Sequence, residues 1–337
     1  MKVYSVFLFL ALLPNLLLAD WKAERESLDK VYPVGVFRIF YTLQGEHALP
    51  QNNRRDRNGN EVPDYIELIA LKLRSADVLF HKTFGLMHPL QSPRYRDEVH
   101  YIDVHMLKMK SKGSGGDGIH LFKYEALPLS NAKSLAIKLS TRLRDGSLTP
   151  SHELFHLYQN GYTLFKNRWY TEGTARWSEY VQKKGTGSRK SLPSTVEEME
   201  VLLAQTYDTK SLWRQLAYLL DKNSGHFSYP PIANERVPGY PGVIEDNRIY
   251  GYNFIKSFLE QLDLMDDIAS NAYGLPHYEW REKRQKSELN NVYILCGLKH
   301  AIINESMGME ANNELNSFLL LLEKYMDNSC KDKVSAK

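Results

Sequence analysis

The amino-acid sequence predicts an α+β fold, with a small mixed sheet in the N-terminal half and a largely helical C-terminal half. Residues 36–41 and 99–106 alternate in polarity and are rich in strand-forming residues, and residues 134–139 are a third strand candidate. Beyond about residue 149 the pattern is mainly helical. Because the strands precede the helices instead of alternating with them, an α+β architecture is favoured over repeated βαβ units.

The N-terminus has the features of a secretory signal peptide. Lys2 supplies a positive charge, residues 6–13 form an apolar run, and Ala19 is a small residue just before Asp20. The alternative, a membrane anchor, is disfavoured because the run is shorter than the roughly 20 residues that a spanning helix needs. We therefore expect cleavage after Ala19, a secreted or periplasmic location, and no stable membrane insertion.

The composition sets bounds on the function of the mature chain. The 337 residues suffice for one large domain or two smaller ones. The balance of 43 basic against 40 acidic residues gives a net charge of +3, which is no reason to expect a nucleic-acid partner. Cys296 and Cys330 are the two cysteines, and in an oxidising compartment they could form one disulfide bond.

The segments around the strand candidates are expected to differ in structure. Only residues 20 to about 33 precede the first strand candidate. Residues 47–60 are polar and turn-like, and Pro63 then opens an amphipathic helix that ends at about Phe84. The glycine-rich residues 113–118 are expected to be a flexible loop.

The turn-like segment continues into oxygen-bearing side chains at the spacing of an EF-hand calcium loop. At loop positions 1, 3, 5, 9 and 12 stand Asp56, Asn58, Asn60, Asp64 and Glu67. Oxygen ligands without His or Cys suit Ca²⁺. Glu61, however, stands at position 6, where such loops have Gly for a sharp turn. The alternatives are a structural calcium site and a polar turn that caps the following helix.

A candidate metal-binding helix begins near residue 150. His152 and His156 are four residues apart, so on a helix both imidazoles lie on one face and can bind the same metal ion. Glu153, beside the first histidine, is the candidate general base of a zinc hydrolase. Thr149 or Ser151 is expected to cap this helix.

A second helical segment, residues 169–179, supplies candidate partners for the two histidines. Glu172 follows His156 by 16 residues, so a turn and a returning helix can bring its carboxylate to the same ion as a third ligand. Three protein ligands and one water form a catalytic zinc site. Glu179 lies two turns further on, where it could orient a zinc-binding histidine or remain a solvated carboxylate.

Together, the two helical motifs resemble the gluzincin clan of thermolysin-like zinc peptidases. The motifs read H-E-L-F-H-x-x-Q and W-Y-T-E-G-T-A-R-W-S-E. The resemblance implies that zinc is bound by His152, His156 and Glu172, and that Glu153 activates water. It also implies that the strand before the active-site helix, residues 134–139 here, binds an extended peptide.

The N-terminal loop carries a related resemblance. The stretch D-x-N-G-N-x-x-P-D-Y is similar to one in secreted bacterial metalloproteases with the same helical motifs. The family resemblance implies a zincin-like catalytic subdomain over residues 20–185 and a helical subdomain over residues 186–337. It further implies a Tyr-Gly-containing helix after the zinc motifs, where the hydroxyl of Tyr250 or Tyr252 could stabilise an oxyanion or simply pack.

Three functions fit these observations. The first is a secreted zinc metallopeptidase that hydrolyses the peptide bonds of peptides or proteins by means of a metal-activated water. The second keeps the zinc but hydrolyses a non-peptide ester or amide. The third is a non-catalytic, calcium-stabilised binding module that retains the two helices as a scaffold. The presence of Glu153 favours an enzyme, since a scaffold has no need of that carboxylate.

Overall fold

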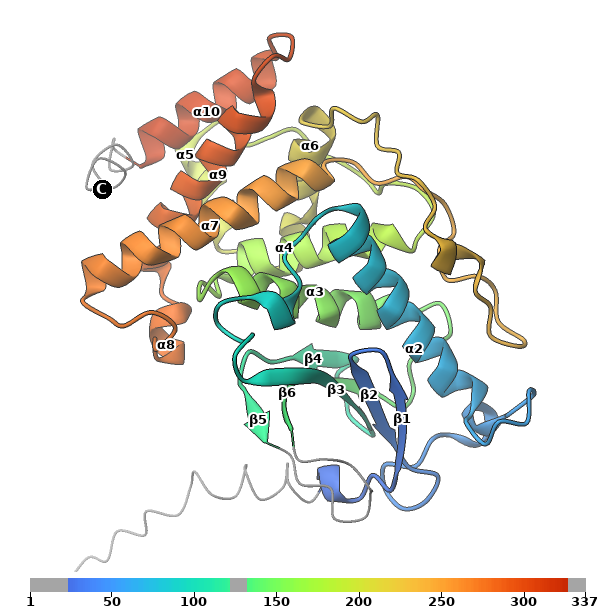
Figure 1. The fold of residues 1–337 in the computed structure, drawn as a ribbon. Coiled ribbons are helices and arrows are strands. Elements are labelled where there is room, and N and C mark those ends of the chain that lie inside the picture. Colours follow the sequence, from blue (N-terminus) through green and yellow to red (C-terminus); the bar gives the residue numbers. More distant parts are fainter. Residues whose placement is uncertain (1–23, 122–131, 327–337) are drawn as a thin grey trace, which may run out of the picture.

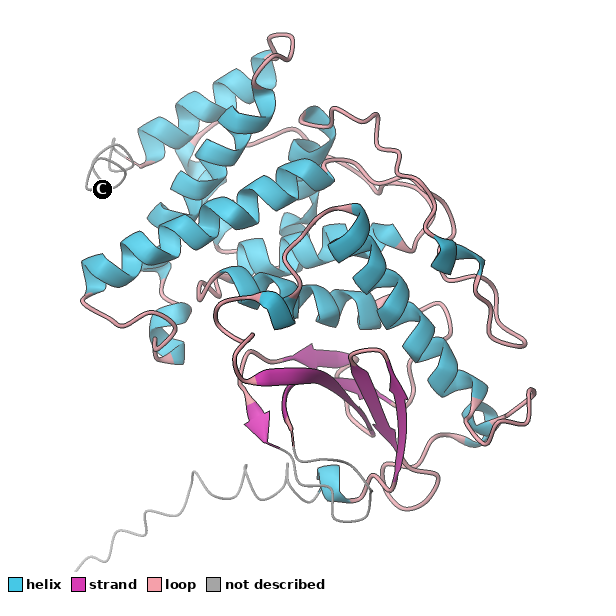
Figure 2. Ribbon diagram, in the orientation of Figure 1, coloured by secondary structure: helices cyan, strands magenta, loops and turns pink. Residues whose placement is uncertain are grey.

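The protein has the α+β fold that the sequence predicts. The computed structural model describes residues 24–121 and 132–326, so the predicted signal peptide and Cys330 lie outside the described residues. A six-stranded sheet lies at one end of the molecule, two helices lie against one of its faces, and most of the other helices are stacked beyond them (Figure 1 and Figure 2).

The sheet mixes parallel and antiparallel strands. Its strands are β1 (Lys30–Val34), β2 (Phe37–Tyr41), β3 (Val99–Leu107), β4 (Gly113–Gly115), β5 (His120–Leu121) and β6 (Lys133–Ser140). The order is β1-β2-β3-β6-β4, and β5 also pairs with β6. The pairs β2–β3 and β3–β6 are parallel, whereas β1 is antiparallel to β2, and both β4 and β5 are antiparallel to β6.

The register of the three central strands gathers apolar side chains on one face. Ile39 of β2 stands opposite Val104 of β3, which stands opposite Ile137 of β6. All three side chains are fully buried. Because side chains alternate between the faces of a strand, the residues two positions away share this face. The face is covered by α2 and α3 (Figure 1).

Helices form most of the remaining chain. The α-helices are α2 (Asp64–Asp77), α3 (Thr149–Tyr162), α4 (Arg168–Ser178), α5 (Val196–Leu203), α6 (Lys210–Leu219), α7 (Tyr252–Tyr273), α8 (Glu282–Gln285), α9 (Asn291–Ser306) and α10 (Asn313–Tyr325). Short 3-10 helices are η1 (Gln51–Arg54), η3 (Pro89–Gln91), η4 (Glu179–Val181), η5 (Tyr207–Thr209), η6 (Pro231–Asn234) and η7 (Glu288–Asn290). The helix predicted to end at about Phe84 is confirmed, but its last part is the π-helix η2 (Val78–Thr83).

Two predictions about the sheet are wrong. Residues 30–34 form β1, so a strand begins before the first strand candidate, and Gly35, with a φ of 58°, turns the chain into β2. Residues 113–115 form β4 instead of a flexible loop, because their backbone pairs with β6. This pairing places Gly113 opposite Leu139 and Gly115 opposite Ile137. The glycines of this segment therefore predict a loop where the structure has an edge strand.

The main apolar core joins the sheet to the C-terminal helices, and a second, small cluster consists of Leu28, Phe40 and Leu107. One cluster of buried side chains includes Ile39 of the sheet and Leu322 of α10, so it crosses the predicted subdomain boundary after residue 185. Cys296 is buried in α9, and its disulfide bond with Cys330 stays a prediction. Within residues 24–121 and 132–326, no helix has the length and apolar character needed to cross a bilayer.

Candidate metal centre

The helix that carries both histidines, α3, packs between the sheet and α4. Its predicted caps are wrong. The N-cap residue is Leu148, which makes no side-chain capping hydrogen bond. The hydroxyl of Ser151 donates to the side chain of Gln182 instead, and Oγ1 of Thr149 lies 3.0 Å from the hydroxyl of Ser147. Ser151 thus ties the start of α3 to the segment that follows η4.

Three side chains from α3 and α4 meet at one point. Nε2 of His152 lies 3.3 Å from Oε2 of Glu172, and Nε2 of His156 lies 3.7 Å from the same oxygen. One ligand atom from each residue lies within 4.8 Å of the other two. Among the described residues, this is the one group of three such side chains at this spacing, and it could hold a metal ion.

Each histidine meets an oxygen acceptor at its other ring nitrogen. Nδ1 of His152 lies 3.1 Å from Oε1 of Glu179, and Nδ1 of His156 lies 2.7 Å from Oε1 of Gln159. An acceptor at Nδ1 favours the tautomer that carries its proton there. With its proton at Nδ1, each ring would have an Nε2 lone pair available for a metal ion that Glu172 also binds.

The charges of the group are strongly coupled. Burial lowers the pKa of His152, but hydrogen bonds with Glu172 and Glu179 outweigh it and raise that pKa to about 9. Burial raises the pKa of Glu172, yet its hydrogen bonds with the two histidines hold it well below its usual range. A carboxylate that faces an imidazole of high proton affinity, as Glu172 faces His152, is a site where a divalent cation can replace a proton.

Glu153 faces the edge strand β4. Its carboxylate is buried, which raises its pKa, and it accepts a hydrogen bond from the backbone N–H of Gly115. A Cβ atom at Gly113 would lie 2.9 Å from Oε1 of Glu153, and a Cβ at Gly115 would lie 2.8 Å from the Glu153 carbonyl oxygen. Both positions therefore require glycine for β4 to approach α3 this closely.

The strand beside Glu153 is β4, whereas the resemblance to zinc peptidases implies that residues 134–139 bind the peptide. The assigned strand, residues 134–139, lies within β6, which has β3 on one side and β4 and β5 on the other. Its backbone groups are already paired, so β6 cannot accept an extended peptide. The edge of β4 has no second neighbour among the described strands.

The tyrosine at this site is Tyr207, not Tyr250 or Tyr252. The rings of Tyr250 and Tyr252 pack against aromatic rings of α6 and of the segment after η2, at centroid distances of 5.0 and 4.8 Å. The ring of Tyr207, in η5, lies 6.3 Å from the ring of His152. Burial raises the pKa of Tyr207, and the charge of Glu172 raises it further.

The predicted calcium loop is ordered by its own hydrogen bonds. The carboxylate of Asp56 accepts from the backbone N–H groups of Gly59 at 2.8 Å, Asn60 at 3.2 Å and Glu61 at 2.8 Å. The side-chain amide of Asn60 donates to Glu67 at 2.8 Å, and that of Asn58 does so at 3.0 Å. Four of the five predicted ligands therefore gather around one loop.

Asp64, the fifth predicted ligand, has a different partner. It is buried, and its Oδ2 accepts from the guanidinium of Arg57 at 2.7 Å. Glu61 takes the left-handed conformation, with a φ of 66°, that Gly supplies at position 6 of calcium loops. Calcium binding stays a prediction.

Sequence reasoning missed Gln159 and Tyr207. The spacing of Gln159, three residues after His156 on a helix, could have indicated its role, since side chains three apart are neighbours. No local pattern marks Tyr207, which reaches the site from a separate turn. The guanidinium groups of Arg168 and Arg176 lie 5.7 and 5.0 Å from the centre of its ring.

A hollow of about 400 Å³ opens beside His156 and Glu172, and residues 115–117 line its other side. No family model matches the chain, and no curated protein or solved structure is significantly similar to it. The evidence for a function is therefore the geometry of the site. That geometry comprises two imidazoles and a carboxylate able to hold a metal ion, with Glu153 beside them and β4, which has no second neighbour among the described strands, next to Glu153.

Proposed function

We propose that the protein is a secreted or periplasmic zinc metallopeptidase. The observation that carries the proposal is the meeting of His152, His156 and Glu172 within 4.8 Å, with Glu153 on the same turn of α3 as the first histidine. A structural metal site needs no such additional carboxylate, whereas a hydrolytic site needs a base near its water.

The donor set fits zinc. Imidazole nitrogen and carboxylate oxygen are common zinc ligands, and three protein ligands leave a fourth position open. The acceptors at both Nδ1 atoms support this choice, because they hold each ring with Nε2 toward Glu172. When bound, zinc would supply Lewis acidity that polarises a carbonyl group and lowers the pKa of a water molecule.

Glu153 is the group that would move the proton. Its buried carboxylate has a raised pKa, which suits a general base that must later act as an acid. In the proposed reaction, Glu153 accepts a proton from the attacking water and delivers it to the leaving nitrogen. Tyr207 keeps its proton because its pKa is raised, so its hydroxyl is a candidate donor to the developing oxyanion.

The edge of β4 favours a peptide as the substrate. An extended peptide can pair with the backbone of an exposed strand and place its carbonyl groups in register. β4 lies directly beside Glu153, and glycines at positions 113 and 115 bring the two close together. A small non-peptide ester or amide would make no use of this edge.

The proposal is tested by metal analysis and by the Glu153→Gln variant. The purified mature protein is expected to contain about one zinc ion per chain and to cleave peptides in a mixed library. Glu153→Gln should keep the zinc and lose at least about 100-fold in kcat/KM, because the general base is gone. Glu200→Gln, at an exposed position in α5, is the matched control.

Each outcome separates the three functions considered. Absence of zinc would remove both hydrolase functions and leave the binding module. Zinc without peptide cleavage, together with hydrolysis of simple esters, would support the non-peptide hydrolase. Full activity in Glu153→Gln would overturn the proposed mechanism.

A further inference from the structure

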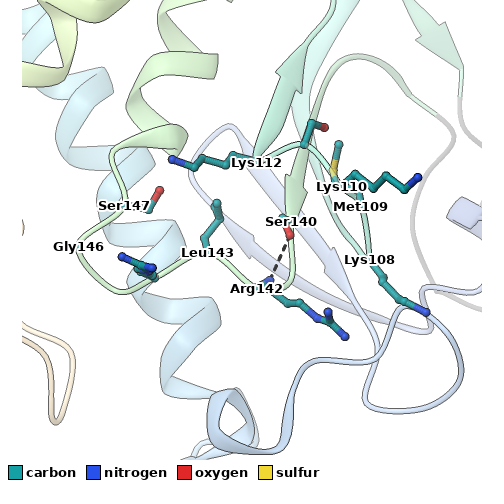
Figure 3. Close-up of a pocket in the computed structure, with 11 residues that line it drawn as sticks. Lys108, Met109, Lys110, Lys112, Ser140, Arg142, Leu143, Gly146 and Ser147 are labelled. Atoms are coloured by element: carbon teal, nitrogen blue, oxygen red, sulfur yellow. Dashed lines mark hydrogen bonds between the residues drawn. The ribbon is translucent and has the colours of Figure 1, made fainter.

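A large hollow of about 990 Å³ lies at one end of β4 and is lined by basic side chains. Its walls are residues 108–112, which connect β3 to β4, and residues 140, 142–144, 146 and 147, from the end of β6 and its connection to α3 (Figure 3). Asp145 belongs to the same connection but does not line the hollow. The basic side chains are Lys108, Lys110, Lys112, Arg142 and Arg144. No acidic side chain among the described residues lines it. We call this hollow the basic pocket.

The charge of the basic pocket is largely uncompensated. All five basic side chains are exposed. Lys108 lies 3.4 Å from a carboxylate oxygen of Glu46, but within the described residues the other four have no carboxylate at ion-pair distance. The chain as a whole carries 43 basic and 40 acidic residues, so this is a local concentration of charge. A hollow lined by one sign of charge attracts ligands of the opposite sign.

The basic pocket is continuous with the proposed substrate edge. Lys112 immediately precedes Gly113, the first residue of β4, whose Cβ position lies 2.9 Å from Oε1 of Glu153. An extended chain advances about 3.3 Å per residue, so a peptide on this edge would pass from Glu153 to the pocket within a few residues. The hollow beside His156 lies at the other end of β4 and has both acidic and basic side chains.

The direction of β4 decides which part of a substrate would meet the basic pocket. Antiparallel pairing is the more stable arrangement per residue. An antiparallel peptide would run from Gly115 toward Gly113, so its residues after the cleaved bond would approach Lys112. From this geometry we infer that the enzyme selects peptides with acidic side chains shortly after the cleaved bond, and that the basic pocket binds those side chains. This inference rests on the proposed peptidase function.

The first experiment compares peptides that differ only in charge. Fluorogenic peptides share one cleaved bond and carry Glu, Gln or Lys at the second to fourth positions after it. The zinc-loaded mature protein is expected to cleave the Glu peptide at least about tenfold faster than the Lys peptide in kcat/KM, since several exposed ion pairs act together. The ratio should shrink in about 0.5 M NaCl, which screens exposed charges.

Charge reversal in the basic pocket provides the second comparison. The double variant Lys110→Glu with Arg144→Glu is expected to invert the Glu-to-Lys ratio. Lys190→Glu, an exposed lysine remote in sequence from both pocket walls, should keep the wild-type ratio. Binding of the same peptides to the Glu153→Gln variant, measured by fluorescence anisotropy, gives a readout that does not depend on turnover.

The outcomes distinguish this inference from the proposed function. Peptide cleavage without a preference for Glu, or a preference that survives charge reversal, would overturn the inference and leave the peptidase function intact. Failure to cleave any peptide would overturn the peptidase function, and equal anisotropy for Glu and Lys peptides would then overturn acidic recognition too. Pocket-dependent binding of heparin without any peptide preference would make the pocket a polyanion anchor and also overturn the inference.

Discussion

Nδ1 of His156 lies 2.7 Å from Oε1 of Gln159, three residues further along α3. The amide of Gln159 is itself held, because it donates to the carbonyl oxygen of Thr171 at 2.8 Å and to Oγ1 of Thr174 at 2.6 Å. Gln159 therefore connects the imidazole of His156, a candidate metal ligand on α3, with the backbone of α4, the helix that carries Glu172.

The variant Gln159→Met is expected to weaken zinc binding. It removes the acceptor at Nδ1, so the imidazole of His156 loses its orientation, and loss of such a partner typically lowers metal affinity by about 10- to 100-fold. Zinc affinity is measured by competition with a chromogenic chelator. Thr174→Val removes one acceptor of the Gln159 amide and the hydrogen bond from Thr174 to the Tyr170 carbonyl, but it leaves the acceptor at Nδ1 of His156 in place. It should therefore lower thermal stability while changing zinc affinity much less. Equal zinc affinity in wild type and Gln159→Met would contradict the role.

Gly115→Ala is expected to reduce kcat/KM by about 100-fold, the effect of a displacement of roughly 1 Å at an active site. The added Cβ would meet the backbone carbonyl of Glu153 at 2.8 Å, and a backbone atom cannot move aside as a side chain can. Gly116→Ala is the control, because a Cβ at that position has nothing within 4 Å. Steady-state kinetics on one peptide would decide, and similar losses in both variants would rule out the close-approach argument.

Asp266→Asn is expected to stabilise the protein at alkaline pH. Burial raises the pKa of Asp266 from 3.8 to about 7, and its Oδ1 has no hydrogen-bond partner among the described residues. Because the folded state binds this proton more tightly, the contribution to stability is full below about pH 4 and is lost as the pH rises through about 7. The free energy of unfolding of the variant should therefore exceed that of wild type by roughly 2–4 kcal/mol at alkaline pH.

Urea unfolding of wild type and Asp266→Asn at about pH 5 and about pH 8 measures this difference. The difference in free energy of unfolding should be smaller at the lower pH, where Asp266 is almost fully protonated in the folded wild type. Asp208→Asn, at an exposed position, should show no such pH dependence. If Asp266→Asn raises the free energy of unfolding equally at both pH values, ionisation of Asp266 is not the cause of the increase.

Glu61→Gly is expected to raise the free energy of unfolding by roughly 0.5–1 kcal/mol. Glu61 has a φ of 66°, where an L-residue with a side chain is strained, and Gly removes that strain. The same replacement at Glu200, inside α5, should lower stability by about 1 kcal/mol, since Gly is unfavourable within a helix. Chemical denaturation of both variants measures whether the free energy of unfolding rises or falls. A loss of stability in Glu61→Gly would refute the strain argument.

The parts of the molecule that the sequence predicts are those set by local periodicity. The spacing of His152 and His156 places both side chains on one face of α3, and Glu172 is brought to them because a turn separates two regular helices. The alternating strands are likewise found at β2, β3 and β6. In each case, the periodicity of the helix or strand alone determines which residues share a face.

The parts that the sequence does not predict depend on contacts between distant segments. β4 consists of Gly-Ser-Gly, which has little intrinsic preference for a strand. It forms because α3 leaves no room for a side chain at Gly113 or Gly115 beside β6. Tyr207 reaches His152 from η5, and its position is decided by the packing of α6 against α4. Such long-range packing has no periodic signal in the chain.

The three candidate metal ligands are distributed between two helices, and this has a consequence for the lifetime of the protein. A divalent ion held by His156 and Glu172 would close a chain loop of sixteen residues in the way a covalent crosslink does. Loss of that ion would remove this crosslink between the two helices and would loosen α4 from α3. If the proposed function holds, scarcity of the metal would make the protein inactive and also easier for proteases to degrade, so its lifetime would follow metal supply.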